Sequence, residues 1–139
     1  MAQETTTAID VVKDFLDALE RSDIDGACAL LHPDVAYQNV PFPPARGLQA
    51  VERQLRGLGR DFLSFEVVHH NIAASGETVL TERTDVLTVG PVRAAFWVCG
   101  TFELRDGKIV LWRDRFDFID VAWAFIRGGV RALLDRTRA

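Results

Sequence analysis

Hydrophobic residues recur at helical spacing near both ends of this 139-residue chain and alternate with polar residues in between. Near the N-terminus, apolar positions three or four apart predict helices, because that spacing places them on one helix face. Thr6 or Thr7 is suited to cap the first helix and Ser22 or Asp23 the second, while Gly47 precedes the third. The expected helices cover residues 9–19, 22–31 and 48–58, and the second ends near His32–Pro33.

Strand-like alternation dominates the middle of the chain. A short strand over residues 35–40 ends at the prolines of the segment 41–44, and four longer strands follow. Breaks at Ser75–Gly76, Gly90–Pro91 and Asp106–Gly107 separate the long strands, and the last of them is typical of a hairpin turn. The long strands are expected over residues 62–72, 78–87, 93–104 and 108–118, before a final helix over 119–136 that Gly128–Gly129 interrupts.

The order of these elements predicts the class of fold. Helices followed by hairpin-connected strands favour an α+β architecture over a parallel, doubly wound sheet. A long, strongly curved sheet, mixed but largely antiparallel, that wraps around the helices would form a cone with an apolar interior. The chain length fits a single domain, residues 1–139, with no internal repeat or linker.

Asp114 interrupts an otherwise apolar strand face. Side chains alternate along a strand, so Val110, Trp112, Asp114, Phe116 and Phe118 share one side, and four of these five are apolar. That side is expected to be buried, and an unpaired charge there costs roughly several kcal/mol. Asp114 therefore needs partners or an altered pKa.

Arg83 and Asp85 can supply those partners, because they lie two apart on another expected strand and share a face. An arginine between two carboxylates inside an apolar cup can carry out acid–base chemistry. The alternative is a structural ion pair between Arg83 and Asp85, and these residues alone leave it open.

Composition and charge narrow the function classes. Apolar residues make up 48% of the chain and charged residues 26%, which is typical of a globular domain. The net charge of −4 and the scattered arginines argue against a nucleic-acid partner. Cys28 and Cys99 are expected to be free thiols in a reducing compartment. No signal-peptide-like or membrane-spanning run is visible, so we expect a cytoplasmic protein.

Neither a metal site nor a cofactor is expected. His69 and His70 are adjacent on a strand, so they face opposite ways and cannot comfortably ligate one metal, and His32 lacks a nearby carboxylate pattern. The sequence contains no phosphate loop, dinucleotide fingerprint or serine nucleophile elbow.

Taken together, the polar positions resemble the limonene-1,2-epoxide hydrolase family, in particular its bacterial, mycobacterial type. The likeness runs from about Ile9 to Phe118 in element order. It rests on Tyr37-x-Asn39, on Arg83-x-Asp85 and on the segment Trp112-Arg113-Asp114-x-Phe116-Asp117. The resemblance implies the cone-shaped fold shared with nuclear transport factor 2, scytalone dehydratase and ketosteroid isomerase.

The resemblance also implies a role for each polar residue. Asp114 would take a proton from water, Tyr37 and Asn39 would hold that water, Asp85 would protonate the epoxide oxygen, and Arg83 would bridge the two carboxylates. Two close carboxylates in a low dielectric would share one proton. The substrate would be an apolar terpene-, lipid- or steroid-like epoxide, and the pocket-lining residues would be Leu87, Phe96, Val98, Trp112 and Phe116.

Two other functions remain open at this stage. The first is an isomerase or cyclase of the same fold that acts on steroid- or polyketide-like rings with one aspartate as base, although the first helix lacks a tyrosine to hold an oxyanion. The second is a non-catalytic ligand-binding module, which would have little reason to retain a costly buried acid–base–arginine set. Apolar surface on the last helix and on the sheet, where Trp97 and Cys99 face away from Phe96, predicts a homodimer.

Overall fold

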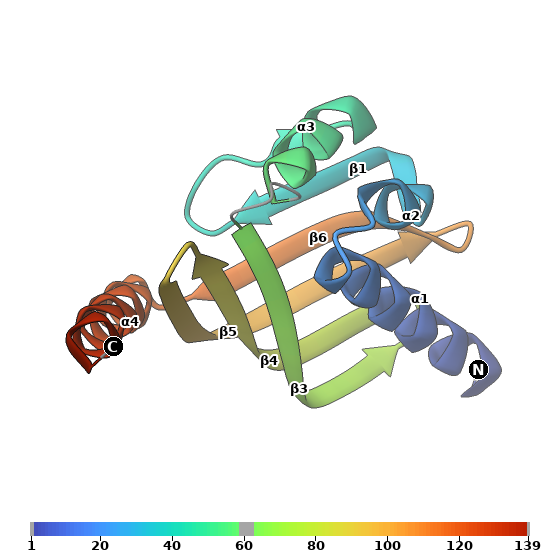
Figure 1. Ribbon diagram of the computed structural model, residues 1–139. Coiled ribbons are helices and arrows are strands. Elements are labelled where there is room, and N and C mark those ends of the chain that lie inside the picture. Colours follow the sequence, from blue (N-terminus) through green and yellow to red (C-terminus); the bar gives the residue numbers. More distant parts are fainter. Residues whose placement is uncertain (1, 59–62, 139) are drawn as a thin grey trace.

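A computed structural model describes residues 2–58 and 63–138 and shows helices packed against one sheet, with a separate C-terminal helix (Figure 1). The first helix begins earlier than predicted, whereas the other three begin and end close to the predicted positions. They are α1 (Ala2–Glu20), α2 (Ile24–Ala29), α3 (Leu48–Leu58) and α4 (Phe118–Arg138).

The described strands form a six-stranded sheet in the order β2-β1-β6-β5-β4-β3. Neighbouring strands run antiparallel, with the exception of β1 and β6, which run parallel. This pair places the first strand of the sheet in the sequence beside the last one. The sheet is therefore mixed and largely antiparallel, as predicted; its strong curvature stays a prediction. The strands are β1 (Leu31–Asn39), β2 (Ala45–Arg46), β3 (Leu63–Ser75), β4 (Thr78–Val89), β5 (Val92–Arg105) and β6 (Lys108–Phe116).

Helix α1 packs on the inner face of the sheet because its apolar residues form one continuous stripe. Phe15, in the middle of that stripe, is fully buried and contacts the rings of Phe102 and Trp112 edge-on, at centroid distances of 6.4 and 5.0 Å. Val51 and Leu55 of α3 are fully buried in the same core.

Helix α4 lies beside the start of β5, at the opposite end of the sheet from α1 (Figure 1). Gly128 permits close contact, because a β-carbon there would overlap the backbone carbonyl oxygen of Arg93. The Gly128–Gly129 pair does not interrupt the helix, contrary to the prediction. No helix within the described residues is long and apolar enough to cross a membrane.

Several predicted boundaries were wrong for local reasons. The first helix continues through Thr6 and Thr7, so neither residue caps it. Asp23 does cap α2, accepting a hydrogen bond from the Gly26 amide, but Leu31 already belongs to β1. Phe62, the expected start of a long strand, lies outside the described residues.

The predicted face of β6 is correct only from Trp112 onward. A register shift in the β5–β6 ladder leaves Val110 without a paired residue, and Ile109 takes the buried position instead. Such a bulge inserts one residue and reverses the alternation before it. Phe118 begins α4, so it is not a strand residue either.

Candidate active site

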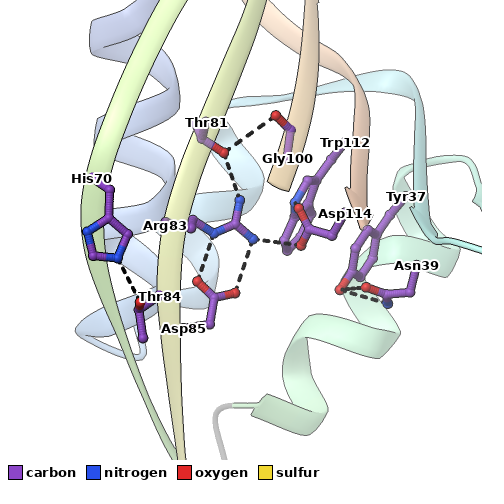
Figure 2. Close-up of polar contacts among 10 residues, drawn as sticks. All are labelled: Tyr37, Asn39, His70, Thr81, Arg83, Thr84, Asp85, Gly100, Trp112 and Asp114. Carbon is purple, nitrogen blue, oxygen red and sulfur yellow. Dashed lines mark hydrogen bonds and ion pairs between the residues drawn. The ribbon is translucent and has the colours of Figure 1, made fainter. Parts of the chain in front are cut away.

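Three charged side chains meet on the buried inner face of the sheet. Arg83 and Asp85 come from β4 and Asp114 comes from β6, and their exposures are 0%, 5% and 4%. Arg83 donates from Nε to Asp85 Oδ1 at 2.7 Å and from Nη2 to Asp85 Oδ2 at 3.1 Å. The same Nη2 donates to Asp114 Oδ2 at 2.8 Å, so the guanidinium bridges both carboxylates (Figure 2).

Burial and pairing set the charges of this cluster. Burial alone would lower the pKa of Arg83, but the Asp114 and Asp85 carboxylates more than offset this effect and raise it. The guanidinium therefore stays positively charged. Two ionised carboxylates would leave one net negative charge in an apolar interior, whereas one retained proton makes the cluster neutral. The geometry thus favours a cluster that holds a single proton.

Asp114 is almost completely buried. Burial raises the pKa of Asp114, opposed by the Arg83 charge and by a hydrogen bond from Trp112 Nε1 to Asp114 Oδ1 at 3.0 Å. A carboxylate with a raised pKa is a stronger base when ionised, while the two donors stabilise that ionised form. Asp114 can therefore both accept a proton and keep it for part of a reaction cycle.

Tyr37 and Asn39 lie beside Asp114 because β1 and β6 pair in parallel. The register places Tyr37 opposite Trp112 and Asn39 opposite Asp114. Asn39 Nδ2 donates to the Tyr37 hydroxyl at 3.0 Å, and the Tyr37 ring stacks on Trp112 with centroids 3.8 Å apart. Burial, followed by the nearby Asp114 carboxylate, raises the pKa of Tyr37, so the phenol keeps its proton. The Tyr37 hydroxyl in turn donates to Asn39 Oδ1 over a longer distance of 3.4 Å, so the two side chains hold each other and present a hydroxyl and an amide next to Asp114.

The polar groups face a cavity of about 310 Å³ with mostly apolar walls. Asp85, Asp114, Tyr37 and Asn39 line it, while Arg83 lies behind the two carboxylates. The five predicted pocket residues are all part of its wall, and α1, β3 and α4 add Leu19, Phe65, Val121 and Phe125. Phe42, which is 57% exposed, also lines the cavity and contacts the Phe118 ring edge-on.

Two further residues surround Arg83 that the sequence analysis did not identify. Thr81 is 4% exposed, and its hydroxyl accepts a hydrogen bond from Arg83 Nη1 at 3.1 Å. Gly100 lies between Thr81 and Asp114 in the strand register. Alternation along β4 places Thr81 on the same face as Arg83, and a glycine inside a strand often marks a close approach. Both signals were available in the sequence.

The outward-facing residues of β6 and its C-terminal junction have structural partners. Arg113 donates to Gln38 and Arg115 donates to Thr101. Asp117 accepts hydrogen bonds from the Ile119 and Asp120 amides and thereby caps α4.

His69 is paired with Arg83 across β3 and β4, whereas His70 and the two cysteines do not line the cavity. His69 is half-buried on β3, where burial and then the Arg83 charge lower its pKa, while exposed His70 hydrogen-bonds Thr84 on the other face. Cys28 and Cys99 are both free and half-buried. Within residues 2–58 and 63–138, no group of three or more His, Cys, Asp or Glu side chains could hold a metal ion.

Comparison with known proteins assigns this arrangement to a family. The model of the limonene-1,2-epoxide hydrolase catalytic domain matches residues 6–127. The chain belongs to the limonene-1,2-epoxide hydrolase family. The chain is 47% identical over 129 residues to epoxide hydrolase EphG of Mycobacterium tuberculosis, covering 92% of this chain and 85% of that protein. It is thus an epoxide hydrolase of the limonene-1,2-epoxide hydrolase type, an enzyme class that works without a cofactor.

Solved structures agree with this membership. A limonene-1,2-epoxide hydrolase-like epoxide hydrolase from M. tuberculosis superposes with a TM-score of 0.90 and 46% identity, covering 95% of this chain and 98% of that one. A nuclear transport factor 2-like protein of unknown function from Burkholderia pseudomallei has a TM-score of 0.74 at 19% identity, covering 86% and 97%. The second likeness concerns the fold alone, and it confirms the predicted α+β class.

Proposed function

We propose that this limonene-1,2-epoxide hydrolase adds water directly to an apolar epoxide and forms a vicinal diol by one-step acid–base catalysis. The observation that carries the proposal is the pair of buried carboxylates bridged by Arg83, with Tyr37 and Asn39 beside Asp114 on the wall of an apolar cavity. An epoxide opens when a nucleophile attacks one ring carbon while the ring oxygen receives a proton. The site offers a group for each of these tasks.

Asp114 is the proposed base. Asn39 lies opposite it in the strand register, so a water molecule held by Tyr37 and Asn39 is within the reach of its carboxylate. The Tyr37 hydroxyl donates to the oxygen of that water and the Asn39 carbonyl accepts one of its protons. Asp114 takes the other proton while the water oxygen bonds to the ring carbon.

Asp85 is the proposed acid and Arg83 the positioning group. Asp85 gives its proton to the ring oxygen as the carbon–oxygen bond breaks, while the planar guanidinium fixes both carboxylates. The cluster holds one proton before and after the reaction, because the proton that leaves Asp85 is replaced by the one that Asp114 gains. The net charge of the buried site therefore stays constant, and transfer of that proton back to Asp85 resets the enzyme.

The cavity limits the class of substrate. Its aromatic and aliphatic walls suit a hydrocarbon skeleton, and its volume of about 310 Å³ lies at the low end of ligand pockets. A compact terpene-like epoxide fits inside. A lipid- or steroid-like epoxide would extend past Phe42 and Phe118 toward solvent.

The proposal is tested with a panel of apolar epoxides of increasing size, assayed for diol without added cofactor or metal. The best substrate is then used in a single turnover in ¹⁸O-water with enzyme in excess. Direct attack by water gives labelled diol in the first turnover and leaves the protein unlabelled. The Asp114→Asn variant, assayed in parallel, is expected to form little diol.

The opposite isotope pattern would overturn direct addition. If Asp114 or Asp85 attacked the ring and formed an ester, the first diol would carry an oxygen from the enzyme. Solvent label would then appear in the protein, where mass spectrometry of the peptides that contain these two residues detects it.

We further propose that the enzyme is a homodimer with α4 at its interface. The side of α4 that faces away from β5 carries a stripe of apolar residues with exposures between 45% and 70%. A second copy of the chain would cover this stripe by placing the same residues against one another. The stripe consists of Phe118, Ile119, Trp123, Ile126, Val130, Leu133 and Leu134.

The cytoplasmic location also stays a prediction. It rests on Cys28 and Cys99, which are free although both are partly accessible.

A further inference from the structure

Arg83 touches more than the two carboxylates, and its remaining contacts suggest how it is held in place. Its Nε and Nη2 atoms donate to Asp85 and Asp114, whereas Nη1 points to the opposite side and donates to the Thr81 hydroxyl at 3.1 Å (Figure 2). The Thr81 hydroxyl in turn donates to the Gly100 carbonyl at 3.5 Å. The hydroxyl proton is thereby directed away from Arg83, and an oxygen lone pair faces the guanidinium.

Gly100 supplies the space that this arrangement needs. It pairs with Thr81 on one side and with Asp114 on the other, so the three residues form a row across β4, β5 and β6. A β-carbon on Gly100 would lie 2.5 Å from Arg83 Nη1, 2.7 Å from Thr81 Oγ1 and 2.9 Å from Asp114 Oδ1. Real β-carbons do not approach other atoms so closely, and all three groups would have to move.

We propose that Thr81 and Gly100 form a socket that fixes the plane of the Arg83 guanidinium and, through it, the proton affinity of Asp114. Neither residue touches the substrate in this proposal, so both are positioning residues. A planar donor fork can serve two carboxylates only at one rotation about its axis. Thr81 sets that rotation by accepting a hydrogen bond from Nη1, on the side of the guanidinium away from the carboxylates. Gly100 lets the guanidinium lie close to the sheet.

The proposal rests on the proposed function, because it concerns how the base Asp114 is tuned. Burial raises the pKa of Asp114 and the Arg83 charge opposes this effect, while the Asp85 carboxylate from β4 adds to it. Among the described residues, the other titratable groups next to this cluster are Tyr37 of β1 and His69 of β3, which is paired with Arg83. If the guanidinium turns away, this opposition weakens and the pKa of Asp114 rises further. Activity that requires ionised Asp114 then begins at a higher pH.

The test uses Thr81→Val, which keeps the shape of threonine and removes the hydroxyl. With limonene-1,2-epoxide as the probe, we expect kcat to fall roughly 10- to 100-fold, as for the loss of one charge-assisted hydrogen bond. The acid limb of the kcat profile is expected to move to higher pH, with a smaller change in KM. Thr81→Ser is expected to restore both kcat and the limb.

Matched variants separate this role from simple packing. Thr84→Val removes a hydroxyl from the outward face of the same strand, where Thr84 hydrogen-bonds the exposed His70, and it is expected to leave the pH profile unchanged. Gly100→Ala is expected to move the acid limb in the same direction as Thr81→Val. Gly57→Ala, where nothing lies within 4 Å of the added carbon, is its control.

The outcomes are distinct. A Thr81→Val enzyme with the wild-type acid limb overturns the socket, whether or not kcat or thermal stability falls. If Asp114→Asn is inactive in the same assay, the proposed function still stands; if that variant stays active, the proposed function fails instead. If Thr81→Val does not fold, Thr81→Ala is used instead. In that variant, ¹⁵N NMR measures how fast the Arg83 guanidinium rotates. Slow rotation in both the wild type and the variant overturns the socket.

Discussion

At the scale of single residues, the site shows how a fully buried charge is tolerated. Arg83 donates four hydrogen bonds to three side chains of the described residues, which are Asp85, Asp114 and Thr81. Removing one member of a buried ion pair typically costs about 3–5 kcal/mol, because the partner charge stays behind uncompensated. The residues of this cluster therefore depend on one another, and each substitution should be judged by what it leaves unpaired.

We expect Asp114→Asn and Asp85→Asn each to lower diol formation by roughly 10²- to 10⁴-fold, the usual contribution of one proton-transfer group. An amide keeps the shape and can accept from Arg83, but it cannot exchange the required proton. Steady-state assays on purified, folded variants check this expectation. Near-normal turnover by either variant would contradict the assignment of both carboxylates.

The same Asp114→Asn variant carries a prediction about stability. A folded-state pKa above the unfolded value means that the wild type gains stability at low pH and loses it as pH rises through the folded pKa. Asparagine does not titrate. The difference in Tm, variant minus wild type, should therefore increase from about pH 4 to pH 7, and a constant or falling difference would show that the pKa of Asp114 is not raised.

Much of the residue-scale picture was accessible from the sequence, because alternation alone placed Arg83 with Asp85 and put Asp114 on an apolar face. Thr81 obeys the same alternation, but a buried threonine is chemically unremarkable without knowledge of its neighbour. Gly100 becomes meaningful only through the strand register, which brings Arg83 over it from another strand. A sequence shows which residues share a strand face, but not which strands are adjacent.

At the scale of elements, close packing between α4 and β5 shapes one wall of the cavity. Val121 and Phe125 line the cavity from α4, and Gly128 on the same helix contacts the Arg93 backbone. The distance between helix and strand is therefore set by the absence of a side chain at position 128.

We expect Gly128→Ala to destabilise the fold by about 1–3 kcal/mol, as overpacking of a tight contact does, and to raise KM by displacing Val121 and Phe125. Gly129→Ala is the matched control on the same helix, because nothing lies within 4 Å of its added carbon. It should leave KM unchanged and stabilise the helix by up to about 1 kcal/mol. Denaturant unfolding gives the free energy of unfolding of both variants, and steady-state kinetics gives their KM. Equal changes in Gly128→Ala and Gly129→Ala would contradict the proposed role of the contact at position 128.

The elements themselves were mostly predictable, and the errors have local causes. Strand positions followed from alternation, but the bulge at Val110 changes the buried face of β6 from one residue to the next. The glycine pair of α4 suggested a break, whereas packing against β5 outweighs the weak helix propensity of Gly128. A helix can start at any of several residues that are able to cap it, and a sequence does not show which of them does. For this reason Thr6 and Thr7 suggested a start that lies inside the helix.

At the scale of the whole molecule, the apolar stripe of α4 predicts association. We expect Trp123→Asp, in the middle of the stripe, to convert a dimer into a monomer in light scattering coupled to size-exclusion chromatography. Gln49→Asp adds the same charge at an exposed position of α3 and should leave the dimer intact. A wild-type protein that is monomeric at micromolar concentration would contradict the proposed interface.

The extent of one domain over residues 1–139 likewise stays a prediction.

The parallel pairing of β1 with β6 has a consequence for the order of events in biosynthesis. Tyr37 and Asn39 leave the ribosome early, whereas Trp112 and Asp114 are among the last strand residues to be made. Strand pairs this distant in sequence form late, because a long loop must close before their contacts are gained. The proposed water-holding pair and its base therefore meet only after β6 has been made. A polypeptide that stops before β6 contains Tyr37, Asn39, Arg83 and Asp85 but lacks Asp114, so we expect it to be inactive even where β3, β4 and β5 have paired.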